Sequence, residues 1–473
     1  MVCARFKENR NFVSTPYWQL HLTLKRQDAH RMFIHTEEFK EKDAAEAAYR
    51  KITSGSVATV TGSEHKRTFQ QAPLLYDLTT LQKDCNVHYD LTAEKTLSIA
   101  QSLYEKKLIS YPRTGSRHIP EDVMRHIPSL LGKVVSMPEF REYGQSFDMS
   151  DLNTRSVDDT KVTDHHALLV TPNRPLALYK DEQTIYDMIV GRMVEAFSPE
   201  CVKDTTTVRA ECEGIAFETK GCIVRKAGWR SVYGEDNIDT VLPDWKEGDI
   251  LAMSGCSMSS GMTRPKPLHT ESTLLAAMET AGREGLEDEE ARQALKDCGI
   301  GTPATRAAII ETLLKREYMV RVKKSLVPTE KGLALYSIVR GMDIADVEMT
   351  GRWEAELAEI EKGRMPHEAF IRDIESYTRK ITTELLASDK LFGHKASDCA
   401  CPKCGKGRML ERKSAKGRIY YGCERYPDCD FMTWDMPVAT KCEKCGSTLF
   451  RKGSKLYCAK EGCGFEMPVP KKD

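Results

Sequence analysis

The chain has 473 residues, about two to four times the usual length of one domain, so several hydrophobic cores are expected. Lysine plus arginine and aspartate plus glutamate each total 70, and a net charge of zero predicts no general affinity for polyanions. Any nucleic-acid surface must come from local clustering of basic residues. Neither a signal-peptide core nor a run of about 18 apolar residues occurs, so a cytoplasmic protein with no membrane partner is expected.

The first half of the chain alternates between strand and helix patterns. Residues from 17 to about 71 carry alternating or β-branched runs between turn signals, which predict strands. "TAEKTLSIAQSLYEKKLI" has apolar residues at helical spacing and predicts a helix that ends at Ser110. A second helix is predicted at 181–197, and strand patterns return between about 205 and 257. We therefore expect a β domain that is interrupted by an inserted helical domain.

Residues 268 to about 385 are predicted to be helical again, and a linker leads from there into a cysteine-rich tail. The chain contains 16 cysteines, which would be unusual as disulfides in a cytosolic protein. Eight of them lie behind residue 400 with the spacing of metal ligands. The first set is Cys401, Cys404, Cys423 and Cys429, and the second is Cys442, Cys445, Cys458 and Cys463. Two closed four-thiolate sites are structural rather than catalytic, so the tail predicts two structural Zn²⁺ ions.

Basic and aromatic residues are interleaved around the first cysteine set, among them Arg418 and Tyr421. Such a mixture suits single-stranded nucleic acid, because bases stack on rings while cations meet phosphates. The alternative is that the rings form the small core of each ribbon, which we expect for about half of them. In that case the prediction of DNA binding depends on the excess of basic residues around the first cysteine set.

The stretch "LISYPRTGSRHIP" places Tyr111 before a proline and two residues before Arg113. Tyrosine is a poor nucleophile at neutral pH because its pKa is about 10, so a catalytic tyrosine needs cations nearby. Proline blocks continuation of the predicted helix, which would present Tyr111 at a helix end facing a cleft. A guanidinium can grip a phosphodiester while the tyrosine attacks in line. Taken alone, a tyrosine packed at a helix end is the commoner explanation.

Two further segments favour phosphate chemistry. "TDHHALLVT" places two adjacent histidines before an apolar run, with an exposed turn as the alternative. "GIGTPATRAAIIETLLKREY" is a glycine-rich turn that leads into a helix through Thr302. The backbone amides and Thr305 at this helix start suit an anion, and Arg306 adds charge. The alternative is a plain helix cap.

These segments, with "PKPLHTESTLLAAMETAGRE", "LVPTEKG", "MTGRWEAELAEIEKG" and "CPKCG...YGCERYPDCDF", occur in the order found in type IA DNA topoisomerases. The chain resembles the bacterial topoisomerase III group over essentially its whole length. The resemblance implies a multi-domain α+β fold, in which a toroidal gate is followed by two zinc ribbons. The implied parts are the end of a base domain (1–14), a β arch in two halves (15–73 and 198–267), the inserted tyrosine domain (74–197), the helical base (268–385), a linker (386–399) and ribbons at 400–435 and 440–468.

The resemblance also implies roles for individual residues. Tyr111 matches the nucleophile that forms a 5′-phosphotyrosine, and Arg113 matches the arginine that stabilises the transferred phosphoryl group. His165 matches the histidine near the scissile phosphate, and Thr270 lies in a motif of the base that holds single-stranded DNA. The covalent bond conserves the energy of the phosphodiester, so rejoining needs no ATP.

The family also uses a Toprim domain, whose carboxylates hold Mg²⁺ and supply acid–base chemistry. No Asp-x-Asp-x-Glu set occurs in this sequence. Because loss of acid–base help costs about 10² to 10⁴ in rate, we expect little or no activity from this polypeptide alone. We expect it to be either a fragment of a longer enzyme or a subunit that a separate Toprim-containing chain completes. The alternative function is an inactive zinc-ribbon protein that binds single-stranded DNA. Two other enzyme classes are rejected, because the chain lacks the aspartate-rich motif of DHH phosphoesterases and the His-hydrophobic-His spacing of relaxases.

Overall fold

The computed structural model describes residues 1–281, 299–345, 359–387 and 396–469, together with 349, 353 and 356–357. Gaps within these ranges fall at 28, 55–56, 138–139, 141–142, 145–146, 163, 235–238, 414–417 and 427. Parts of the predicted base and linker, at 282–298 and 388–395, therefore lie outside the described residues. The chain divides into two compact units, Met1–Met365 and Pro366–Asp473.

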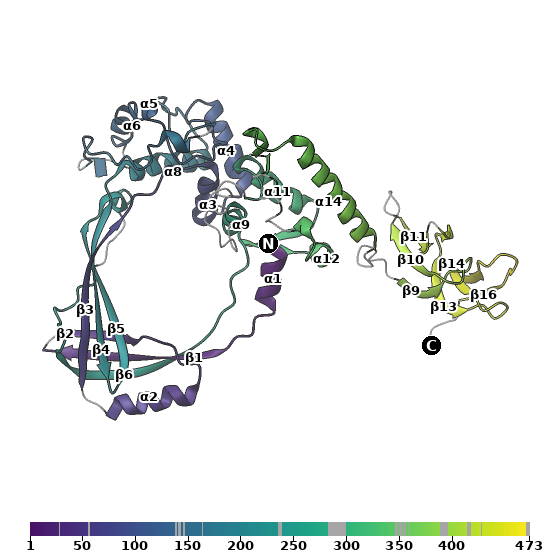
Figure 1. Cartoon of the computed structure of the whole chain (residues 1–473), viewed down its shortest axis with the longest axis horizontal. Helices are drawn as coiled ribbons and strands as arrows, with labels where there is room; N and C mark the ends of the chain where they lie inside the picture. Colours follow the sequence, from purple (N-terminus) through teal and green to yellow (C-terminus); the bar gives the residue numbers. More distant parts are fainter. Residues whose placement is uncertain are drawn as a thin grey trace. The chain divides into compact units, whose positions relative to one another are not determined.

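A closed six-stranded antiparallel barrel forms one part of the first unit (Figure 1). The strands are joined in the order β1-β2-β5-β4-β3-β6. Their bounds are β1 (Pro16–Arg26), β2 (Ala29–His35), β3 (Val57–Gln70), β4 (Cys201–Cys212), β5 (Ile215–Lys226) and β6 (Ile250–Met262). Alternation explains the barrel, because Leu20, Leu22 and Leu24 of β1 all point inward and are fully buried. Helix α2 (Lys42–Ser54) packs against β1 and β6.

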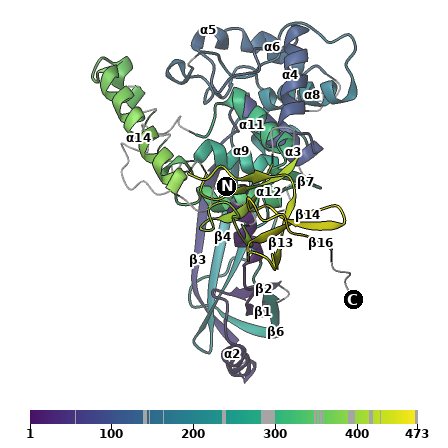
Figure 2. The same cartoon turned by 90° about the vertical axis from the view of Figure 1, so that its right-hand side faces the viewer.

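A helical insert separates β3 from β4. Its elements are α3 (Leu78–Tyr89), α4 (Ala93–Glu105), α5 (Glu121–Met124), α6 (Ile127–Val134), η2 (Asp159–Lys161) and α8 (Lys180–Phe197), with η3 (Gly228–Ser231) packed on α8. One apolar core unites these helices. The long strands β3 and β4 pair from Thr59 with Glu211 to Gln70 with Cys201, and they lead from the barrel to the insert (Figure 2). The predicted interruption of a β domain by a helical one is therefore confirmed.

The base contains the first helix of the chain and the elements that follow β6. They are α1 (Val2–Arg10), α9 (Glu271–Thr280), α11 (Pro303–Lys315), β7 (Met319–Val322), β8 (Ser325–Pro328), α12 (Glu330–Val339) and η4 (Asp343–Ala345). The hairpin β7–β8 corrects the expectation that this whole block is helical. β-branched Val320 and Val322 favour a strand, and Lys323 adopts a left-handed φ of 53° at the two-residue turn.

The three parts of the first unit are joined in a closed circuit, which agrees with the predicted gate fold (Figure 1). Where β1 begins and β6 ends, the N–H of Thr263 donates to the carbonyl oxygen of Thr15 at 2.9 Å. On the other side, α3 packs against α9, and α4 packs against α11. The buried carboxylate of Glu271 accepts the N–H of Ala93 at 2.7 Å across this second junction.

The second unit begins with α14 (His367–Ala387) and continues into two small four-stranded sheets. The first sheet contains β9 (Ala396–Ala400), β10 (Arg408–Lys413), β11 (Ile419–Cys423) and β12 (Met432–Thr433). The second contains β13 (Met436–Lys441), β14 (Thr448–Lys452), β15 (Lys455–Cys458) and β16 (Glu466–Pro468). We call them ribbon 1 and ribbon 2. Among the described residues, no helix has the length and apolar character needed to cross a membrane.

Candidate active site and zinc centres

Helix α4 ends at Glu105, five residues earlier than the predicted end at Ser110. Lys107 takes a left-handed φ of 58°, and the N–H of Leu108 donates to the carbonyl oxygen of Leu103 at 2.9 Å. The N–H of Lys107 donates to the carbonyl oxygen of Tyr104 at 2.8 Å, which completes a Schellman motif. Leu103 and Leu108 are both buried in the core of the insert. The turn therefore ends the helix before the proline is reached.

The tyrosine segment is extended and lies antiparallel to the histidine segment. Ile109 bridges Val170, and the N–H of Ser110 donates to the carbonyl oxygen of Leu169 at 2.8 Å. The side chain of Ser110 accepts the N–H of Leu169 at 3.0 Å. Backbone pairing, rather than a helix end, therefore presents Tyr111. This pairing brings together two segments about sixty residues apart in the chain.

The ring of half-buried Tyr111 lies between two other rings. Its centroid is 4.4 Å from that of His165, at an interplanar angle of 52°. On another side, the ring of Tyr104 meets it edge-on at 5.3 Å. The structure thus brings together two of the predicted site residues, Tyr111 and His165. Tyr104 was missed because a helix that continued to Ser110 would separate Tyr104 and Tyr111 by about 10 Å.

The residues after Tyr111 divide between solvent and interior. Arg113, two residues after the tyrosine, is exposed, whereas Thr114 is only 1% exposed. The Thr114 hydroxyl donates to the carbonyl oxygen of His165 at 2.9 Å and accepts the N–H of Ser116 at 3.1 Å. Thr114 thereby ties the tyrosine loop to the histidine segment. Sequence reasoning did not single it out, because its partner carbonyl lies about fifty residues further along the chain.

The start of helix α11 lies next to this loop. A Cβ at Gly115 would stand 3.3 Å from Pro303, the first residue of α11. The exposed Thr302 and Thr305 are in contact, since the Thr302 N–H donates to the Thr305 hydroxyl at 2.9 Å. This is a helix cap, and it leaves an exposed N-terminus beside the tyrosine segment.

Arg306 and Thr270, which were also predicted to contact DNA, both hydrogen-bond within the base or to the insert. Arg306 is 5% exposed, and its guanidinium donates to the Thr79 hydroxyl at 3.0 Å and to the carbonyl oxygen of Ile300 at 3.3 Å. These bonds tie α11 to α3 and favour a structural role. Thr270 caps α9 and accepts the N–H of Thr273 at 3.2 Å. Its role in DNA binding stays a prediction.

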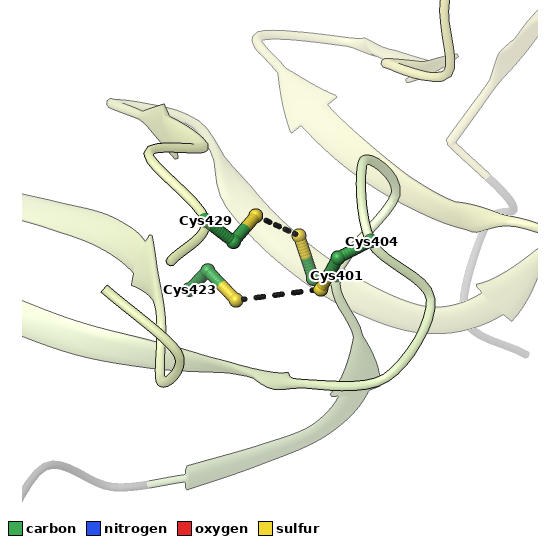
Figure 3. Close-up of side chains that lie close together, drawn as sticks. All are labelled: Cys401, Cys404, Cys423 and Cys429. Carbon is green, nitrogen blue, oxygen red and sulfur yellow. Dashed lines mark hydrogen bonds between the residues drawn. The ribbon is translucent and has the colours of Figure 1, made fainter. Parts of the chain in front are cut away.

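The first cysteine set is grouped as the sequence predicts (Figure 3). The Sγ atoms of Cys401 and Cys429 are 3.8 Å apart, and those of Cys404 and Cys423 are 3.7 Å apart. Zinc–sulfur bonds of about 2.3 Å in a tetrahedron place the sulfurs about 3.8 Å from each other, so the donor set fits Zn²⁺. Gly405 follows the first Cys-x-x-Cys turn with φ 65°, a backbone conformation that suits glycine.

The second set repeats this geometry in ribbon 2. The Sγ atoms of Cys442 and Cys463 are 3.6 Å apart, and those of Cys445 and Cys458 are 3.5 Å apart. Backbone N–H groups lower the pKa of Cys404 and of Cys445 to about 6, which favours the thiolate that binds metal. Both sets are therefore structural zinc centres by their chemistry and geometry.

The aromatic residues of ribbon 1 divide between core and surface. Tyr421 and Phe431 pack against the core that contains the first zinc set. Trp434 is 50% exposed, and the Arg418 guanidinium lies over its ring at 5.1 Å from the centroid. Tyr420 packs against Trp434 at 5.7 Å. Arg418 therefore lies on an exposed aromatic surface, whereas Tyr421 contributes mainly to packing.

Comparisons with known proteins agree with this fold and these sites. Residues 1–372 match the family described as DNA topoisomerase, and residues 398–438 and 439–457 match the topoisomerase DNA binding C4 zinc finger. The chain therefore belongs to the type IA DNA topoisomerase family. It is similar to full-length topoisomerase I from Thermotoga maritima, with a TM-score of 0.62 and 20% identity over 94% of this chain and 71% of that chain. At this identity the likeness shows the fold.

Curated relatives are named DNA topoisomerase 3. The protein from Bacillus cereus (strain ATCC 14579) is 31% identical over 98% of this chain and 66% of its own length. The protein from Bacillus subtilis (strain 168) is 33% identical over 89% of this chain and 60% of its own length. The chain thus spans about three fifths to two thirds of the relatives' length. The predicted family and fold are confirmed.

Proposed function

We propose that this chain carries the strand-breaking tyrosine of a topoisomerase III-like enzyme that cuts, passes and rejoins single DNA strands without ATP. The observation that carries the proposal is the placement of Tyr111, whose ring contacts His165 and which stands two residues before the exposed Arg113. The exposed N-terminus of α11 lies next to the loop, and the positive end of its helix dipole favours a phosphate there. Membership of the type IA family supports the same reaction.

In the proposed reaction, the Tyr111 hydroxyl oxygen forms a bond to phosphorus while the bond from phosphorus to the 3′ oxygen breaks. The tyrosine loses its proton, and the 3′ oxygen gains one as it leaves. Arg113 stabilises the charge on the transferred phosphoryl group, and His165 orients the phosphate. Rejoining is the reverse attack by the 3′ hydroxyl, which restores the phosphodiester and frees Tyr111.

Acid–base help to the 3′ oxygen is assigned to carboxylates and Mg²⁺ of a Toprim domain, because the resemblance implies them. In the described part of the chain, the groups of potential metal ligands are the two cysteine sets. We propose that cleavage requires a Toprim domain, in the same polypeptide or in a partner chain. Mg²⁺ would there stabilise the negative charge that develops at the departing oxygen.

The test uses a single-stranded oligonucleotide labelled at its 3′ end, because the 5′-phosphotyrosine retains that part of the DNA. The chain is incubated with Mg²⁺, with and without a Toprim domain taken from a relative. We expect a labelled covalent adduct when the Toprim domain is present and none with Tyr111→Phe. The matched control is Tyr179→Phe, which changes an 82% exposed tyrosine and should leave the adduct unchanged. No adduct in either arm, or an adduct that survives Tyr111→Phe, would contradict the proposal.

A second proposed function is binding of single-stranded DNA by ribbon 1. The contact of Arg418 with Trp434, next to Tyr420, offers both a stacking surface and a cation. We expect salt-sensitive oligonucleotide binding that survives Tyr111→Phe and falls with Trp434→Ala or zinc removal. The control is Tyr426→Ala, which removes a 65% exposed tyrosine of the same ribbon. Affinity that is indifferent to salt, chelator and Trp434→Ala would exclude this function.

A further inference from the structure

We infer that ribbon 2 completes the core of ribbon 1, so that zinc binding at the two cysteine sets is coupled. Phe450 and Tyr457 of ribbon 2 act as positioning residues for the first zinc site and for the aromatic surface beside it. The coupling follows from packing alone, whereas its effect on DNA binding rests on the function proposed above for ribbon 1. The repeated Cys-x-x-Cys-Gly pattern would by itself indicate two independent modules.

Strand β14 supplies side chains to both cores. Successive residues of a strand point to opposite faces of the sheet. Leu449 is fully buried and packs in ribbon 2's own core, which contains the second cysteine set. Phe450, the next residue, is also fully buried, but it belongs to the core that contains Cys401, Cys423 and Cys429. The largest buried side chain in the core of ribbon 1 therefore comes from ribbon 2.

Strand β15 repeats this division. Leu456 packs in the core of ribbon 2, whereas its neighbour Tyr457 packs against the core of ribbon 1. Phe450 and Tyr457 are cross-strand partners, with ring centroids 6.1 Å apart. Phe450 also contacts Phe431 of ribbon 1 at 5.8 Å. One face of the ribbon 2 sheet thus covers its own zinc set, and the other covers that of its neighbour.

Two hydrogen bonds hold the ribbons together at the edges of this core. The Thr448 hydroxyl, 7% exposed, donates to the carbonyl oxygen of Ala400 at 2.7 Å, directly before Cys401. The Tyr457 hydroxyl donates to the Asp435 carboxylate at 2.8 Å, directly after Trp434. The first bond fixes the backbone that leads into the first zinc knuckle. The second fixes the backbone next to the exposed tryptophan.

Loss of zinc from ribbon 2 should therefore weaken zinc binding at the first cysteine set. A small ribbon has too little core to stay folded without its metal. If ribbon 2 unfolds, Phe450 and Tyr457 leave the neighbouring core, and the first set loses the packing that holds its thiolates in place. A chain that holds zinc in only one of the two ribbons is then unstable, and the ribbons gain or lose zinc together.

The first experiment measures zinc release from each site in the full chain. Zinc-loaded protein is exposed to a chelator and a thiol-alkylating reagent, and peptide mass spectrometry reports the alkylation rate of each cysteine set. Phe450→Ala should speed alkylation of the first set by about tenfold or more, because it opens a cavity there. The matched variant Leu449→Ala should instead accelerate the second set first, and Phe450→Leu should restore most of the protection. Unchanged alkylation of the first set in Phe450→Ala overturns the inference.

The second experiment removes the second site by the double change Cys442→Ser and Cys445→Ser in the full chain. Coupling predicts that alkylation of the first set accelerates and that oligonucleotide affinity falls. A first set that keeps wild-type alkylation rates and one firmly bound zinc overturns the inference. Accelerated alkylation with unchanged DNA affinity supports the coupling but refutes DNA binding by ribbon 1, so the two failures can be distinguished.

Discussion

The zinc centres and the tyrosine site are assembled over very different distances along the chain. Each cysteine set comes from one ribbon, and tight turns bring its first two ligands together. The tyrosine site combines two separate segments of the insert, near Tyr111 and His165, with the start of α11 at Pro303 in the base. A site built from local turns can be identified from residue spacing. A site built from distant segments depends on how each segment ends and which segment it pairs with.

The two kinds of site also differ in what stabilises them. Metal–thiolate bonds dominate the small ribbons, whereas hydrogen bonds and ring contacts of modest strength hold the tyrosine loop. Loss of one ligand should therefore have a much larger effect in the ribbons than loss of one contact near Tyr111. Three substitutions test this difference, and a fourth, at a buried histidine of the base, gives a reference of intermediate size; they follow in order of expected effect.

The largest effect is expected from Cys429→Ser. It removes one of four zinc ligands, and structural zinc contributes about 10 to 16 kcal/mol of apparent binding free energy in small zinc domains. The first site should lose its metal, as measured by zinc stoichiometry. Cys399→Ser is the control, because Cys399 is buried close by but is not part of the set. Equal zinc loss in both variants would mean that burial, not ligation, matters at these cysteines.

An acid-sensitive effect is expected at His269, which is 6% exposed in the base. Burial, reinforced by the positive charge of Arg5, lowers the pKa of His269 to about 4. The unfolded chain, with a pKa near 6.5, binds the proton more readily. The neutral His269 ring therefore makes its full contribution to the free energy of unfolding above pH 6.5. This contribution is lost as the pH falls toward 4, and the loss reaches up to about 3 kcal/mol.

Denaturant unfolding of His269→Gln at neutral pH and at about pH 4.5 measures this contribution. The variant should lose less stability on acidification than the unmodified chain. Equal losses in the two proteins would show that the histidine does not carry the acid sensitivity.

A smaller loss is expected from Thr114→Val near Tyr111. The change keeps the shape of the side chain but leaves the carbonyl of His165 and the N–H of Ser116 without this partner. Buried groups left without a partner cost about 1 to 3 kcal/mol in the free energy of unfolding. Thr184→Val is the matched control, since Thr184 bonds Lys180 on an exposed helix surface. If both variants unfold at the same denaturant concentration, Thr114 does not stabilise the contact between the Tyr111 loop and the histidine segment.

The smallest effect is expected from Tyr104→Ala. An edge-to-face ring contact is worth about 0.5 to 1.5 kcal/mol, so the fold should persist while the Tyr111 ring becomes more mobile. Fluorotyrosine NMR, with the Tyr111 signal assigned through Tyr111→Phe, reports this mobility as a change in line shape. Tyr104→Phe keeps the ring and should resemble the unmodified protein. An unchanged Tyr111 signal in Tyr104→Ala would remove Tyr104 from the site.

The outcome for individual elements shows where sequence reasoning succeeds. The helix predicted at 181–197 is found as Lys180–Phe197, because its apolar spacing is strong and agrees with its burial. The helix that leads toward Tyr111 was predicted too long, since Lys107 adopts a left-handed conformation for which its residue type gives no signal. The hairpin β7–β8 was missed because its strands are only four residues long.

The type of a residue does not determine its surroundings in the fold. Arg306 was predicted from its charge to meet an anion, yet burial against α3 directs its guanidinium to Thr79. Tyr104 and Thr114 received no prediction, because their partners become neighbours only after the chain folds. The roles of Arg113, Thr270, Thr302 and Thr305 toward DNA stay predictions.

The sequence by itself determined the two cysteine sets, the alternation that builds the barrel and the motifs of the type IA family. These features depend on residue type and short-range spacing, which the chain carries into any fold. Only the tertiary structure decided that Tyr111 is presented by pairing with the histidine segment, and that Phe450 packs on the neighbouring zinc site. Both depend on contacts between distant segments, which form where buried backbone groups and apolar side chains must find partners.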